Sequence, residues 1–472
     1  MTRGEAVDST PSSRVQRRTL SSVLAVPQMY QPTSESLKTH PLPRWFDDAK
    51  FGIFSHWTVS SVPSFATMGL DPFALMREEG EKAAFAKTPY AEWYQNAIAI
   101  EGSPAAEYHK TVLGAPDYGT FVDEFFARAR DWNVDSWREL LRRSGARYLV
   151  AVTKHHDGAL MWPSSTVNPR HGHRWQSDRD LIGELAAAVR SIGMRFGTYY
   201  SGGLDWSFQG VGIDSVASLF AAIPQDDGYS AYVEAHWREL ITRYQPDVMW
   251  HDIGHPRGTA GAVQLIADFY NSNPEGVVND RYDIIGVMSG SSHADFSTPE
   301  YSSGPPPAGR KFEVCRGIGS SFGYMQFEDD TSYASVSDLI NLLVNVVADG
   351  GNLLLNIGAM PGGYIPWAQQ VRVLAIGRWL ETNGAAIYGS KPHEASRLIT
   401  ENGANVRVTT GNDGAAYVMV CGRPESAVVH IDGLPSGDVH LVHNSAPVQR
   451  SGNRLVLPVR PDDTPVWVMR IQ

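Results

Sequence analysis

The feature that most constrains this chain is a repeated alternation between short apolar runs and amphipathic helical segments, which begins near Pro43. Helical patterns over residues 134–146, 180–193 and 234–244 are each followed by a run rich in Val, Phe, Tyr or Met. Such an alternation is typical of parallel strands joined by helices. The apolar runs are nearly continuous, as expected of strands that are covered on both faces. The pattern therefore predicts a closed β/α barrel or a large open parallel sheet.

The pattern changes near Tyr388. Beyond this residue, short alternating runs such as NVRVTT, AAYVMVC and PVWVMRI are separated by turn residues, which is typical of an antiparallel β-sandwich. We therefore predict three parts. A disordered leader is expected over residues 1–36, a catalytic β/α barrel over residues 37–388, and a C-terminal β-sandwich over residues 389–472.

Charge and cysteine content exclude several classes of protein. The chain has 40 Lys and Arg against 51 Asp and Glu, which gives a formal net charge of −11. An acidic chain lacks the basic surface that nucleic acid requires, so we expect no nucleic acid partner. No apolar run reaches the ~18 residues of a membrane span, so we expect no membrane partner either. With Cys315 and Cys421 as its only cysteines, the chain has neither a disulfide framework nor a four-cysteine zinc site.

The N-terminal residues resemble an export signal only weakly. Arg17 and Arg18 precede the stretch TLSSVLAV, but this stretch contains two serines and no A-x-A-like cleavage site follows it. We therefore expect a cytoplasmic protein, with secretion as the alternative. The sequence leaves a homo-oligomer open.

Polar and aromatic side chains gather at the carboxyl ends of the predicted strands. Because catalytic residues of β/α barrels lie at these ends, six separate segments predict one shared pocket. Their terminal residues are His56 and Trp57, His155 to Asp157, Tyr199, Trp250 and Asp252, Asp280 and Arg281, and Glu300.

The residue types narrow the chemistry. The sequence has no Gly-rich phosphate loop and no G-x-S-x-G elbow, which argues against nucleotide chemistry and a serine hydrolase. Two carboxylates on different strand ends, set among Trp, Tyr and His, are the groups that glycoside hydrolysis needs. One carboxyl group protonates the leaving oxygen, and the other attacks the anomeric carbon or activates water.

Several motifs then resemble one family. From about Pro43 to the C-terminus, the chain is similar to the α-L-fucosidases of glycoside hydrolase family 29. The matching motifs are PRWFDDAKFGIFSHW, PYAEWY, SGARYLVAVTKHHDG, RFGTYYSGGLDW, YQPDVMWHD, VNDR, FSTPEY, RGIGSSFGY and GGNLLLNIG, in this order.

The resemblance implies a fold and a set of roles. The family fold is a somewhat irregular (β/α)8-like barrel of TIM type followed by a C-terminal antiparallel β-sandwich. The implied activity is a retaining, exo-acting α-L-fucosidase that hydrolyses terminal α-L-fucose from fucosylated glycans or fucosides, without a cofactor or metal. Asp252 would be the nucleophile and Glu300 the acid/base. The implied substrate-binding residues are His56, Glu92, Trp93, His155, His156, Tyr199, Trp250 and Arg281.

Other interpretations stay open from the residues alone. Glu313 competes with Glu300 for the acid/base role, and Arg281 could form a structural ion pair with Asp280. The pair His155-His156 suggests a metal-dependent hydrolase as an alternative. Against it, adjacent residues on a strand point to opposite faces, and no third ligand has suitable spacing. A non-catalytic sugar-binding protein on the same barrel is the remaining alternative.

Overall fold

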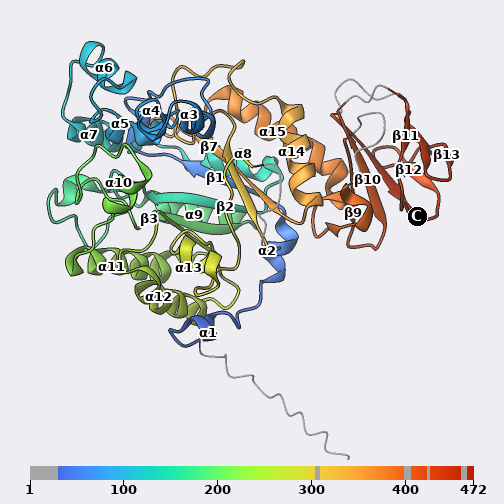
Figure 1. Ribbon diagram of the computed structural model, residues 1–472, viewed down its shortest axis with the longest axis horizontal. Helices are drawn as coiled ribbons and strands as arrows, with labels where there is room; N and C mark the ends of the chain where they lie inside the picture. Colours follow the sequence, from blue (N-terminus) through green and yellow to red (C-terminus); the bar gives the residue numbers. More distant parts are fainter. Residues whose placement is uncertain (1–29, 303–308, 398–404, 423–425, 459–464) are drawn as a thin grey trace, which may run out of the picture.

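The computed structural model describes residues 30–302, 309–397, 405–422, 426–458 and 465–472. Its centre is a parallel sheet of seven strands in the order β5-β4-β3-β2-β1-β7-β6. Strands β1, β2, β3 and β7 of this sheet are labelled in Figure 1. Every residue of β1, β2, β4 and β7 is buried, because helices cover one side of the sheet and the barrel interior fills the other. The strands are β1 Phe51–His56, β2 Tyr148–Lys154, β3 Arg195–Ser201, β4 Val248–Asp252, β5 Val277–Val278, β6 Glu313–Gly317 and β7 Asn352–Gly358.

An irregular segment, residues 296–300, completes the barrel between β5 and β6. Parallel bridges join Asn279 to Phe296, Ser297 to Phe312, and Glu300 to Cys315. The segment does not form a regular strand, since Pro299 has no backbone N–H to donate to a neighbour. The fold is therefore the irregular (β/α)8-like barrel that the family resemblance implied, and its irregular position carries Glu300.

Long helices cover the outside of the barrel, and shorter ones are inserted after strand ends. The covering helices are α8 Val134–Ser144, α9 Leu181–Ser191, α11 Asp227–Tyr244, α12 Gly258–Ser272, α14 Val336–Ala348 and α15 Trp367–Asn383. Inserted between β1 and β2 are α3 Pro72–Glu78, α4 Glu81–Ala86, η2 Ala91–Trp93, α5 Tyr94–Ala97, α6 Pro104–Thr111 and α7 Tyr118–Ala129. Two more short helices, α10 Val216–Ala221 and α13 Ile284–Ser289, follow β3 and β5. None of the helices within the described residues is long and apolar enough to cross a membrane.

The start of the described chain differs from the prediction of a leader that ends at residue 36. The Tyr30 backbone exchanges two hydrogen bonds with the Asn271 side chain of α12, at 2.7 and 2.9 Å. Helix α1, Ser34–Leu37, also contacts α12 and buries Leu37. These apolar and hydrogen-bonding contacts order residues 30–36, whereas residues 1–29 lie outside the described part. Helix α2, Arg44–Ala49, then leads into β1.

The C-terminal part is an antiparallel β-sandwich. A five-stranded sheet has the order β12-β15-β10-β9-β8 and faces a three-stranded sheet of order β11-β14-β13. The strands are β8 Lys391–Pro392, β9 Asn405–Thr410, β10 Ala416–Cys421, β11 Val428–His430, β12 Val439–Leu441, β13 Arg450–Ser451, β14 Arg454–Val456 and β15 Val466–Ile471.

Strand β10 shows how the sandwich joins the barrel. Ala416, Val418 and Val420 lie in the core of the sandwich. Their alternate neighbours, Tyr417 and Met419 among them, belong to the main core of the barrel. Both faces of this strand are thus buried, and Figure 1 shows the sandwich beside α14 and α15.

Candidate active site

One pocket lies at the carboxyl ends of the barrel strands. It has a volume of about 270 Å³, and all ten residues predicted for the site line it: His56, Glu92, Trp93, His155, His156, Tyr199, Trp250, Asp252, Arg281 and Glu300. Parallel strands bring their carboxyl ends to one rim, which is why segments that are far apart in the sequence meet here.

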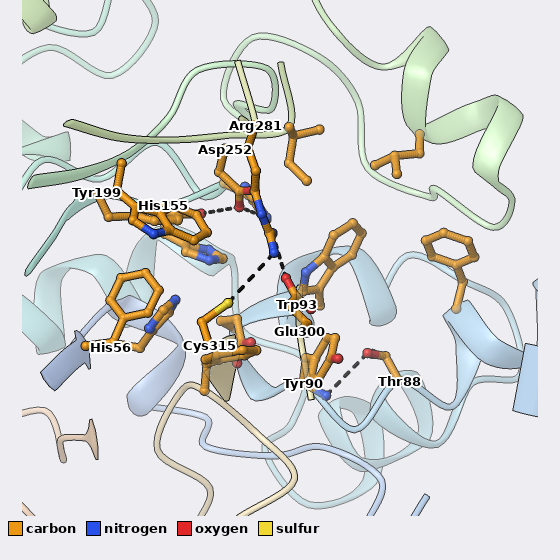
Figure 2. A pocket seen from close by; sticks show the side chains of 18 of the residues that line it. His56, Thr88, Tyr90, Trp93, His155, Tyr199, Asp252, Arg281, Glu300 and Cys315 are labelled. Atoms are coloured by element: carbon orange, nitrogen blue, oxygen red, sulfur yellow. Dashed lines mark hydrogen bonds and ion pairs between the residues drawn. The ribbon is translucent and has the colours of Figure 1, made fainter. Parts of the chain in front are cut away.

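Arg281 joins the two carboxylates. Its Nη1 lies 3.2 Å from Asp252 Oδ1 and 2.6 Å from Glu300 Oε1, and Figure 2 shows its side chain between them. The Nε and Nη2 atoms of Arg281 donate to the hydroxyl and carbonyl oxygens of Thr298, which fixes the guanidinium. The alternative ion pair with Asp280 is wrong, because Asp280 instead accepts a hydrogen bond from the Thr298 hydroxyl.

Asp252 is held in its ionised form. Burial acts to raise the pKa of this carboxyl group, but the charge of Arg281 and the hydrogen bond from the Tyr199 hydroxyl hold the pKa below its usual value. Tyr199 donates to Asp252 Oδ2 at 2.7 Å. Only 9% of the Asp252 side chain is exposed, against 23% for Glu300. The site therefore presents an anionic, fixed carboxylate beside a more accessible one.

A tight backbone turn follows each of these two carboxylates. Ile253 has φ of 59° and Tyr301 has φ of 47°, the left-handed region that residues with a Cβ atom seldom adopt. Gly254, after Ile253, donates its N–H to the Arg281 carbonyl at 2.8 Å. The turn after Asp252 thus also fixes the backbone of the residue that contacts both carboxylates.

The three histidines of the pocket are neutral. Burial lowers the pKa of His56 and of His156 to about 4, and lowers that of His155 well below its usual value. His56 Nδ1 contacts Asn356 Oδ1 at 2.7 Å, and the Asn356 amide donates to Phe322 O, so His56 Nδ1 carries the proton. A neutral imidazole offers one donor and one acceptor, which suits the hydroxyl groups of a sugar.

His155 and His156 both face this pocket, so the expectation that they point to opposite faces is wrong. Strand β2 ends at Lys154, and its pairing with β3 is already irregular between Val152 and Lys154. The alternation of side chains therefore stops before the histidine pair, and the two rings lie 4.0 Å apart. Within the described residues, one group of three side chains is close enough together to bind a metal ion, and it consists of His40, His293 and Asp295. This group does not line the pocket and does not include His155 or His156.

Glu92 and Trp93, on η2, form another part of the wall. Glu92 Oε2 accepts the Gly323 N–H at 2.8 Å and the Ser321 hydroxyl at 3.1 Å, while burial raises the pKa of Glu92 to about 7. The Trp93 ring meets the His156 ring edge-on at 5.3 Å. These contacts tie the helical insertion after β1 to the barrel rim.

Glu313 lies outside this pocket lining. Its carboxylate accepts hydrogen bonds from the Tyr148 hydroxyl and, at 3.1 Å, from Trp250 Nε1. Burial raises the pKa of Glu313 to about 7. Glu313 thus supports Trp250 from within the barrel, whereas Glu300 contacts Arg281 in the pocket.

Other lining residues were missed by the sequence analysis. Phe54, two residues before His56 on β1, could have been found from the two-residue period of a strand. Phe322 belongs to the motif RGIGSSFGY, but its place beside His56, with ring centroids 5.1 Å apart, depends on a loop. Apolar residues from α3, α4 and α10 carried no signal at all: Met76, Ala84, Phe85, Val216 and Leu219.

Known proteins match both the chain and its fold. A family profile described as Alpha-L-fucosidase matches residues 19–385. The chain belongs to the α-L-fucosidase family. It is 31% identical to the tissue alpha-L-fucosidase of Mus musculus over 425 residues, which is 87% of this chain and 84% of that protein. It is 30% identical to an alpha-L-fucosidase of Dictyostelium discoideum over 427 residues, which is 85% of this chain and 83% of that protein.

Solved structures of α-L-fucosidases have the same fold as this chain. The alpha-fucosidase of Thermotoga maritima in complex with a mechanism-based inhibitor superposes with a TM-score of 0.82 and is 38% identical, covering 94% of this chain and 99% of that one. The structure of that enzyme in complex with fucose gives a TM-score of 0.81 at 37% identity, covering 94% of this chain and 100% of that one. The activity of this α-L-fucosidase is accordingly that of a glycoside hydrolase acting on a carbohydrate.

Proposed function

We propose that this α-L-fucosidase is a retaining enzyme in which Asp252 is the nucleophile and Glu300 the acid/base. The observation that carries the proposal is that oxygens of both carboxylates contact one nitrogen of Arg281, at 3.2 and 2.6 Å. The two oxygens therefore lie within about 6 Å of each other, which fits the ~5–5.5 Å of retaining sites better than the ~6.5–9.5 Å of inverting ones.

The chemistry follows from this arrangement. Asp252, ionised, attacks the anomeric carbon of an α-L-fucoside while Glu300 donates its proton to the leaving oxygen. The bond to the leaving group breaks, and a β-linked fucosyl ester on Asp252 forms. Glu300, now ionised, takes a proton from water as the water attacks the same carbon, which releases α-L-fucose and restores both carboxyl groups.

The pocket favours a terminal 6-deoxy sugar. The buried floor around His56, Tyr199 and Trp250 and the volume of about 270 Å³ fit one pyranose ring, which is the basis for exo action. Phe54, Trp250 and Phe322 belong to one apolar cluster that borders it. Such a surface accepts the C5 methyl group of fucose but leaves a 6-hydroxyl group without a partner, and an unpaired buried hydroxyl group is costly.

The test is replacement of the nucleophile. We expect Asp252→Gly to lower hydrolysis of an aryl α-L-fucoside by at least about 10³-fold, because losing a nucleophile can cost as much as ~10⁶-fold in other hydrolases. Azide should restore turnover and yield the β-fucosyl azide, because it enters from the face that Asp252 leaves empty.

Two further measurements bear on the same proposal. NMR of the wild-type reaction should show the α-anomer first, and a β-anomer would refute retention. Hydrolysis of an aryl α-L-fucoside should exceed that of the matching α-L-galactoside, which differs only by its 6-hydroxyl group. Binding of fucose without any hydrolysis would instead favour the sugar-binding alternative.

A further inference from the structure

A second cavity meets the active site at the proposed acid/base. Its volume is about 490 Å³, and it shares the side chains of Tyr90 and Glu300 with the first pocket. The remaining wall comes from the insertion after β1, from Tyr301 beside Glu300, and from β6 and the loop that follows it, which supply Arg316 and Ser320. The mechanism derived above uses none of these three residues.

Arg316 is the unusual member of this wall. Its Nε donates to Gly317 O at 2.9 Å, and its guanidinium lies 5.2 Å from the centre of the Tyr301 ring. Within the described residues, its two Nη atoms have no hydrogen-bond acceptor and no carboxylate within ion-pair distance. Burial lowers the pKa of Arg316, while Tyr301 and Asp338 act in the opposite direction. A partly desolvated cation thus faces the cavity, and no carboxylate of the described residues lies within ion-pair distance of it.

The acidic groups nearby are engaged elsewhere. Asp71, at the exposed mouth of the cavity, accepts the Ala74 N–H at the start of α3. Asp338 accepts a hydrogen bond from the Ser335 hydroxyl at the start of α14. Glu300 contacts Arg281, at 2.6 Å. These contacts leave the donors of Arg316 for a ligand.

The position of the cavity beside Glu300 indicates which ligand would bind to Arg316. An acid/base must lie beside the glycosidic oxygen, so the group attached to that oxygen leaves past Glu300. A guanidinium binds a carboxylate or a sulfate through two parallel N–H donors, and it does so best where water is partly excluded. Tyr301 adds an aromatic ring beside the guanidinium, and the Ser320 hydroxyl, which donates to Glu328 Oε1 at 3.2 Å, keeps its oxygen as an acceptor.

We propose that the second cavity is a leaving-group subsite for an acidic sugar, in which Arg316 binds a carboxylate or sulfate substituent. This inference rests on the proposed function of Glu300. If Arg316 binds such a substituent, the preferred substrates are fucosides whose leaving group carries a negative charge near the cleaved bond. This preference is local, since the whole chain is negatively charged.

The test compares aryl α-L-fucosides that carry a carboxylate, a sulfonate or a neutral carboxamide at the same ring position. The measured quantity is the ratio of kcat/KM for each charged substrate to kcat/KM for the carboxamide. We expect Arg316→Gln to lower this ratio about tenfold, the effect of losing one charge-assisted hydrogen-bonded pair. Arg316→Lys, which keeps the charge but not the paired donors, should lower it less.

The matched control is Arg147→Gln. Arg147 also lies over a tyrosine ring, 3.9 Å from the centre of Tyr388, but it is outside both cavities. Its replacement changes the net charge equally and should leave the ratio unchanged. In the wild-type protein the ratio should also fall at high salt, which tests the idea even if Arg316→Gln does not fold.

The outcomes separate the hypotheses. A fall in the ratio for the carboxylate, the sulfonate or both supports the subsite and identifies the group it prefers. An equal ratio in the wild type and in Arg316→Gln overturns the subsite while hydrolysis of the carboxamide still supports the proposed function. Failure to hydrolyse any of the three fucosides overturns the proposed function itself.

Discussion

Arg281 and Thr298 together decide how the two carboxylates of the pocket are held. Arg281 contacts Asp252 and Glu300 through one nitrogen, and its other donors bind Thr298, two residues before Glu300. Glu313, the competing carboxylate, is instead bound by Tyr148 and Trp250. The two glutamates therefore differ in what their loss would change.

Replacement of Glu300 and of Glu313 should give different kinetic patterns. Glu300→Ala should lower kcat/KM by ~10²–10⁴-fold for fucosides with poor leaving groups, which need a proton, and much less for activated aryl fucosides. Glu313→Ala should lower activity evenly across leaving groups, because it loosens Trp250. Of these two glutamate variants, azide should restore activity only to Glu300→Ala, and the product should be the α-fucosyl azide. The reverse pattern in the two variants would assign the acid/base role to Glu313.

At the scale of elements, a buried ion pair fixes the segment that leads to Glu300. Asp295 accepts hydrogen bonds from His40 Nδ1 at 2.9 Å, from the Tyr270 hydroxyl of α12 at 2.6 Å and from the Val278 N–H of β5 at 2.7 Å. His40 Nε2 faces the Pro274 carbonyl, which can only accept. His40 therefore donates from both nitrogens and is protonated when the pair is formed.

The pair predicts a stability that depends on pH. Burial opposes protonation of His40, but Asp295 raises the His40 pKa above 6.5, while the pKa of Asp295 itself falls to about 2. The contribution of His40 is therefore complete below about pH 6.5 and is lost as pH rises through its folded pKa. We expect His40→Gln to cost ~3–5 kcal/mol of unfolding free energy at pH 6, and clearly less at pH 9.

Urea unfolding at the two pH values measures this cost, and the chain offers a control. His430 and Asp432 form a pair of the same length, 2.9 Å, but both side chains are exposed. His430→Gln should change the unfolding free energy by less than about 1 kcal/mol at either pH. A cost of His40→Gln that stays constant or grows between pH 6 and pH 9 would contradict a protonated His40.

At the scale of the whole molecule, the C-terminal sandwich is part of the same core as the barrel. Met419 of β10 is fully buried in the main core cluster, on the face of the sheet opposite Val418 and Val420. The site, by contrast, lies at the carboxyl ends of the barrel strands, and none of the described residues of the sandwich lines it. Stability and activity should therefore separate.

Replacement of Met419 tests this separation. Met419→Ala should lower the unfolding free energy by ~2–5 kcal/mol, the usual cost of truncating a buried methionine, and leave kcat/KM of the folded protein unchanged. Val428→Ala, at a site that is 39% exposed, should cost much less. Calorimetry should show barrel and sandwich unfolding together. Two well-separated transitions would indicate that the core is not shared.

Local patterns in the sequence determined much of this protein. The apolar runs that became β1, β2, β4 and β7, the helices between them and the short strands after Tyr388 follow from periodicity, which depends on neighbours along the chain. The polar ends of those strands also follow, since parallel strands place their carboxyl ends at one rim. The motif resemblance then supplied Glu92 and Trp93, and all ten predicted residues line one pocket.

Tertiary structure decided what depends on pairing between distant segments. The closure of the barrel by residues 296–300, which places Glu300 beside Arg281, arises from bridges to Asn279 after β5, to Phe312 before β6 and to Cys315 within β6, which no local period encodes. The early end of β2 turns both His155 and His156 into the pocket. Arg316 lacks a counter-ion within the described structure because of how the loops after β6 pack. The sequence can name such residues, but the partners of a side chain are set by contacts across the fold.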